Sequence, residues 1–154
     1  MFSFFGKWAR SKGNAKNVEQ TRKRRRPCLV ERLEDRQLLT TFYVANLNDS
    51  GEGSLRQAIT DANSTVGADV IEFNVAGTIA LKKALPTITD QVDIDGTSAP
   101  GFTNAPVVAV NFNLQAGLKF EAGSDNSSLS GLSLINGSGS GVRVSGAGGL
   151  EISG

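Results

Sequence analysis

The chain has 154 residues, enough for one domain of ordinary size, and its net charge of +1 hides a strong asymmetry. Residues 1–40 hold eleven Lys and Arg against four Asp and Glu, whereas the remainder is acidic. There is no histidine, and Cys28 is the single cysteine, so histidine-dependent catalytic sites, intrachain disulfides and thiolate metal clusters are excluded. We therefore expect no cofactor, no bound metal and no catalytic residue. We also expect no transmembrane segment, because no apolar run is long enough to span a bilayer.

Residues 1–40 are basic and polar, without a sustained helical or strand period. The consecutive basic residues 22–26 repel one another in any compact state. No long apolar stretch follows these charges, so a conventional secretory signal peptide is missing. We interpret residues 1–40 as a disordered basic leader. The basic run lacks interleaved aromatic residues and an attached recognition fold, so export explains it better than nucleic-acid binding, which remains a third hypothesis.

The stretch of residues 30–39, directly after the basic run, resembles the LEPR-XLL motif. That motif occurs near the N-termini of large, repetitive surface proteins of some bacteria and is regarded as an export or sorting element. The residues that match its pattern are Leu33, Glu34, Arg36, Leu38 and Leu39. Asp35 stands where the motif has proline. The alternative is a short amphipathic helix. The resemblance implies a protein that is secreted or displayed at the cell surface.

The folded region is predicted to begin near Thr41 with a short extended segment and a polar, turn-rich loop at residues 46–53. Apolar residues then follow at helical spacing: Leu55, Ala58, Ile59 and Ala62. Ser54 is a plausible N-cap, and Asn63 follows the last apolar residue. We expect a helix of about two turns that caps the N-terminal end of a larger β structure, because an open end exposes apolar core and unpaired strand edges.

After this helix the chain consists of short apolar i, i+2 pairs separated by turn residues, as expected for strands whose side chains alternate between two faces. The pairs are Ile71/Phe73, Ile79/Leu81, Val92/Ile94, Val108/Val110, Leu118/Phe120, Leu132/Leu134, Val142/Val144 and Leu150/Ile152. Two of these pairs recur with one and the same 24-residue step: Val108 and Val110 precede Leu132 and Leu134, and Leu118 and Phe120 precede Val142 and Val144. Such a period is typical of repeat folds.

A 24-residue period with about three short strands per turn predicts an all-β fold, a right-handed parallel β-helix (solenoid) over residues 41–154. A leucine-rich repeat has a similar period, but its asparagine and leucine pattern is missing. A β-sandwich is the main alternative, because Asp95-Gly96 and Asn136-Gly137 could form hairpin turns. The sequence ends within a coil, so we expect that this chain is a fragment of a longer gene product.

The segment from residue 42 to residue 102 resembles the start of the CSLREA and polymorphic-outer-membrane-type β-helix proteins. The resemblance is carried by residues 46–59, by 62–63 and 67–73, and by 77–79, 85–89 and 92–96, in that order. Gly53 occupies the place of the cysteine that opens the family pattern. The resemblance implies a parallel β-helix in a secreted or surface-anchored protein, and it does not imply one particular activity.

Two groups of outward-facing charges are candidate sites. Lys119 and Arg143 are separated by the same step as the apolar pairs, so the period stacks them on neighbouring coils, where they could bind an anionic ligand. Glu121 could instead offset their repulsion. Asp93 and Asp95 project from one strand face and could share a calcium ion, although a solvated surface followed by a turn explains them as well.

We interpret the chain as part of a structural or adhesive bacterial surface protein that presents an elongated β-helical surface to polysaccharide or to other cell-surface components. The alternative is a polysaccharide lyase or hydrolase that acts on acidic polysaccharide. Release of reducing ends or unsaturated sugars from polygalacturonate would distinguish the two hypotheses.

Overall fold

The computed structural model describes residues 39–154, and these residues form a β-rich unit with a single α-helix. The predicted disordered leader and all residues of the sorting-like motif except Leu39 lie outside the described residues. Leu39 precedes the first strand and is exposed. None of the helices in the described part of the chain is long and apolar enough to cross a membrane.

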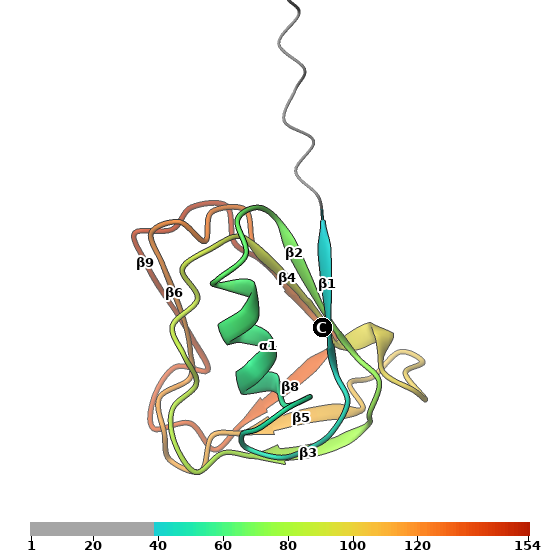
Figure 1. Ribbon diagram of the computed structural model, residues 1–154. Helices are drawn as coiled ribbons and strands as arrows, with labels where there is room; N and C mark the ends of the chain where they lie inside the picture. The colour runs from blue at the N-terminus through green and yellow to red at the C-terminus, as the bar shows by residue number, and fades with distance from the viewer. Residues whose placement is uncertain (1–38) are drawn as a thin grey trace, which may run out of the picture. The chain divides into compact units, whose positions relative to one another are not determined.

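The strands form three sheets that the chain visits in turn (Figure 1). Sheet A contains β1 (Thr40–Val44), β2 (Asp69–Phe73), β4 (Val92–Asp95), β7 (Ser128–Ser130) and β10 (Glu151–Ser153), in that order. Sheet B contains β3 (Gly77–Ala80), β5 (Val108–Asn111) and β8 (Leu132–Ile135). Sheet C contains β6 (Leu118–Glu121) and β9 (Val142–Ser145). We call one passage of the chain through these sheets a circuit.

Every strand pair within residues 39–154 is parallel, so the alternative of a sandwich built from antiparallel hairpins is wrong for this region. Val108 pairs with Leu132, and Leu118 pairs with Val142, as the 24-residue period predicts. The period is not uniform. On sheet A, Val92 lies 23 positions after its partner Asp69, whereas Ser128 lies 35 positions after Asp93. Much of this extra length lies in the long connection between β4 and β5, which includes the short 3₁₀-helix η1 (Gly96–Ser98).

Alternate residues of each strand point inward, and in-register pairing stacks them into apolar columns. On sheet A, Ile71, Ile94, Leu129 and Ile152 occupy successive places in one such column. The first three side chains are at most 3% exposed and belong to one continuous core. Burial of these side chains stabilises the fold by about 1.5–3 kcal/mol each.

The α-helix, α1 (Leu55–Ala62), lies against β1 and β2 in the first circuit (Figure 1). Its buried residues are the four that the helical spacing predicted: Leu55, Ala58, Ile59 and Ala62. The Ser54 hydroxyl accepts a hydrogen bond from the Gln57 amide at 3.3 Å, which confirms Ser54 as the N-cap. Asn63 then ties the end of the helix to the connection after β3, because its side chain donates to the Thr87 carbonyl at 2.7 Å. The circuits lie one above another and form a stack. The helix covers the core at the end of this stack that contains β1.

The inward-facing side chain of Asp69 is ionisable. Asp69, at the start of β2, is 2% exposed, and neither carboxyl oxygen has a hydrogen-bond partner among the described residues. Burial, reinforced by the nearby negative charge of Asp90, raises the pKa of Asp69. Folding therefore makes this carboxyl group harder to ionise than it is in the unfolded chain.

Candidate anion-binding site

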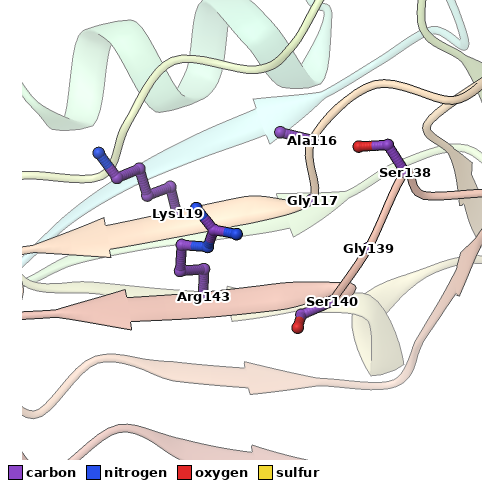
Figure 2. Close-up of a pocket in the computed structure, with 7 residues that line it drawn as sticks. All are labelled: Ala116, Gly117, Lys119, Ser138, Gly139, Ser140 and Arg143. Carbon is purple, nitrogen blue, oxygen red and sulfur yellow. The ribbon is translucent and has the colours of Figure 1, made fainter.

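Strands β6 and β9 place Lys119 directly beside Arg143. The two residues are partners in the parallel register of sheet C. Leu118 and Phe120 point into the core, which forces Lys119, between them, to the outer side. Arg143 lies on the same outer side of β9 and is exposed. The predicted stacking of these two cations is therefore present, and Figure 2 shows their side chains on neighbouring strands.

The charge of the two cations is only partly offset. The Lys119 ammonium forms an ion pair with the Glu121 carboxylate, and both side chains are about two-fifths exposed. The sequence predicted that Glu121 could offset the repulsion between Lys119 and Arg143, and the ion pair has this effect on Lys119. Arg143 has no ion pair within residues 39–154. The guanidinium is therefore the cation whose hydrogen-bond donors are available for a ligand.

A small cavity of about 110 Å³ lies beside the two cations (Figure 2). Its lining comes from the ends of β6 and β9 and from the corners that precede them: Ala116, Gly117, Lys119, Ser138, Gly139, Ser140 and Arg143. The corners approach each other closely because Gly117 has no side chain. A Cβ atom there would collide with the carbonyl oxygens of Ser140 and Gly141 on the next circuit. Gly117 therefore allows the two corners that line the cavity to approach each other.

The lining determines which chemistry the cavity supports. A guanidinium binds a carboxylate through two parallel hydrogen bonds, and serine hydroxyls donate to and accept from neutral hydroxyl groups. One carboxylate, that of Glu121, contacts Lys119 of this lining through the ion pair. The arrangement is suited to binding a carboxylate that carries neighbouring hydroxyl groups.

The corner residues of the site were not predicted from the sequence, although the sequence contains a signal for them. Ser140 follows Ala116 by one 24-residue step, and Gly141 follows Gly117 by the same step. This is also the step from Lys119 to Arg143. Extending the period from the apolar pairs to the polar corners would have placed Ala116, Gly117 and Ser140 beside the two cations.

Asp93 and Asp95 on β4 form the second candidate site. Their carboxylate oxygens accept hydrogen bonds from other residues of the fold. Asp93 accepts a hydrogen bond from the Ser128 hydroxyl. Asp95 accepts from the Thr97 amide at 2.9 Å and from the Ser130 hydroxyl at 3.1 Å, and it caps the short helix η1. No group of three or more His, Cys, Asp or Glu residues that could hold a metal ion occurs in the described part of the chain. These carboxylates therefore tie β4 to β7 and to the corner after β4.

Comparison with known proteins gives one partial similarity. No family model and no solved structure matches the chain. Sixty residues are 40% identical to a protein named "Probable pectate lyase C" from Aspergillus flavus and to one of the same name from Aspergillus oryzae. Part of this chain is similar to part of these two proteins. The match covers 39% of this chain and only 13% of each fungal protein.

Proposed function

We propose that this chain belongs to a secreted or cell-surface protein with a structural or adhesive role and that it binds acidic polysaccharide through Lys119 and Arg143. The observation that carries the proposal is the in-register placement of these two cations beside a cavity lined by serine hydroxyls. A uronate unit presents a carboxylate next to ring hydroxyls, which matches these donors and acceptors. The similarity to proteins named as pectate lyases supports the same class of ligand.

We also infer that the fold is a right-handed parallel β-helix of the CSLREA and polymorphic-outer-membrane type. The three parallel sheets, the 24-residue pairing and the helix at the β1 side support this description. Export through the basic leader and the LEPR-XLL-like motif is part of the proposal as well. Leu33, Glu34, Arg36, Leu38 and Leu39 are the residues that carry it.

Binding is tested by isothermal titration of the full chain with polygalacturonate oligomers and with neutral glucan oligomers of equal length. We expect binding to the acidic oligomers only, and we expect it to weaken as salt is added, because exposed charges are screened. Replacement of Arg143 by Ala removes the unpaired guanidinium. It should reduce the affinity about tenfold or more, which corresponds to about 1.4 kcal/mol. Lys119→Ala should have a smaller effect because Glu121 already pairs with the ammonium.

Lys83→Ala is the matched control, because Lys83 is an exposed cation in the connection after β3. It should leave the affinity unchanged. Equal binding by the Arg143→Ala variant and the unaltered chain, or equal affinity for the neutral oligomers, would contradict the proposal.

A lyase that acts on acidic polysaccharide is the second candidate, favoured by the similarity to the two fungal proteins. The cavity lining supplies cations that could hold a substrate carboxylate, and the carboxylate that contacts them, Glu121, is engaged in the ion pair with Lys119. We therefore expect the chain to bind polygalacturonate without forming unsaturated products. Appearance of unsaturated uronate, measured by ultraviolet absorbance and abolished by Arg143→Ala, would favour the lyase instead.

A further inference from the structure

The ion pair on β6 directs the Lys119 ammonium away from the cavity that Lys119 helps to line. Glu121 lies two positions after Lys119, so both side chains face outward from the same strand. The corner residues Ala116 and Gly117, which line the cavity, precede β6. Pairing with Glu121 therefore draws the ammonium along β6 in the direction opposite to this corner. Figure 2 shows the ammonium pointing away from Ser138.

The surroundings of Glu121 leave Lys119 as its partner. Within residues 39–154, Glu121 forms an ion pair with Lys119 alone. Its register partner on β9 is Ser145, which is uncharged. On the other side of β6, a parallel bridge to the connection after β3 places the exposed Thr89 beside Glu121. The carboxylate therefore has neutral hydroxyl neighbours and one cation.

This ion pair is weak enough for a ligand to replace it. The side chains of Lys119 and Glu121 are 43% and 40% exposed, and ion pairs at such exposed positions contribute little to stability. A carboxylate of a ligand offers the ammonium the same charge-assisted hydrogen bond that Glu121 offers. The ammonium of Lys119 therefore has two alternative partners, Glu121 and a ligand in the cavity.

We propose that Glu121 is a positioning residue that holds the Lys119 ammonium away from the cavity and thereby lowers the affinity for ligands with two or more carboxylates. This inference rests on the proposed binding of acidic polysaccharide. A first carboxylate binds Arg143, which has no ion pair within the described residues, and leaves the pair on β6 intact. A second carboxylate binds Lys119 and must displace Glu121, whose negative charge also repels it. Glu121 therefore weakens the binding of a multiply charged ligand more than that of a singly charged one.

The inference is tested by isothermal titration of the full chain and of its Glu121→Gln variant with two trimers of equal length. One is trigalacturonate with all carboxylates free, and the other carries methyl esters on all units but one. Glutamine keeps the size of the side chain and removes its charge. We expect Glu121→Gln to raise the affinity for the fully charged trimer about fivefold to tenfold. The affinity for the singly charged trimer should change less than about twofold, because solvent and salt screen the more distant charge of Glu121.

A double variant shows whether Glu121 acts through Lys119. In a Lys119→Ala chain there is no ammonium to release, so Glu121→Gln should no longer raise the affinity for the fully charged trimer. Glu72→Gln is the matched control, because Glu72 faces outward from β2 on sheet A instead of sheet C. It should change the affinity for neither trimer. Circular dichroism checks that each variant is folded.

The possible failures of this inference and of the proposed function give different results. The inference is overturned, and the proposed function stands, if the unaltered chain binds the fully charged trimer and Glu121→Gln does not raise that affinity. The same holds if the gain is equal for both trimers or persists in the Lys119→Ala chain. If neither the unaltered chain nor Glu121→Gln binds either trimer, the proposed function is overturned together with the inference.

Discussion

The two ends of the described stack present the same type of inward-facing column in two different environments. At the β1 side, Leu55 and Ile59 of α1 cover the core, and both are 1% exposed. At the β10 side, Ile152 occupies an equivalent inward position and is 58% exposed. The alternation of apolar residues is the same in the two regions, so the difference arises from what lies above each circuit. Each circuit is stabilised largely by its neighbours, and an end circuit depends on its cover.

The strongest test of this comparison uses two isoleucines of one column. Ile94→Ala leaves a cavity between two covered circuits and should lower the free energy of unfolding by about 2–5 kcal/mol. Ile152→Ala removes a side chain that is already 58% exposed and should cost less than about 1 kcal/mol. Urea unfolding of the full chain measures both values. Equal losses would show that the two ends do not differ as described.

The cover over the closed end can be weakened at the helix cap. Ser54→Ala removes the hydroxyl that accepts from the Gln57 amide and donates to the Gly51 carbonyl at 2.7 Å. We expect a loss of about 1 kcal/mol in the free energy of unfolding, the usual cost of an N-cap. Thr60→Ala on the exposed face of α1 is the control and should change stability by less than about 0.5 kcal/mol. A cost for Thr60→Ala equal to that for Ser54→Ala would argue that the cap does not matter.

A smaller, pH-dependent effect is expected from Asp69 near the closed end. Because burial raises the pKa of Asp69, the folded chain holds the proton of this group up to a higher pH than the unfolded chain, which releases it at about pH 4. The stability from this group is fully present below that pH and is lost as the pH rises through the raised pKa. Asp69→Asn should remove this loss and make the chain more stable at neutral pH. Urea midpoints measured at several pH values check the prediction.

The matched control for Asp69 is Asp125→Asn, at an exposed carboxyl that accepts a hydrogen bond from the Gly148 amide. This variant removes an exposed carboxyl instead of a buried one, so its pH series is the comparison for Asp69→Asn. If Asp69→Asn keeps the pH dependence of the unaltered chain, the proton on Asp69 does not couple to folding.

Alternation and period made much of this fold predictable from the sequence. The i, i+2 pairs marked nearly every strand, and the 24-residue step gave the pairing of β5 with β8 and of β6 with β9. Strand β7 was missed because it is short and Leu129 alone faces the core, between two serines. The pairing of β4 with β7 could not be predicted from the 24-residue period either, because its partners lie 35 positions apart.

The candidate site was predictable to a similar extent. The period placed Lys119 beside Arg143, because in-register strands stack residues one circuit apart. It did not predict the cavity, which depends on how the corners before β6 and β9 fold. The inward orientation of Asp69 was equally hidden, because a carboxylate at an alternating position normally faces water. Its burial follows from the register of β2 with β1 and β4.

The long connection between β4 and β5 has a practical consequence. It adds length to one circuit, yet β4 still pairs in register with β7, and β3 with β5. Its segment 103–106 is exposed and lies outside every hydrogen-bonded ladder described. Chain length can therefore vary at this corner without altering which side chains face the interior, so it offers a natural place to graft a foreign peptide for display.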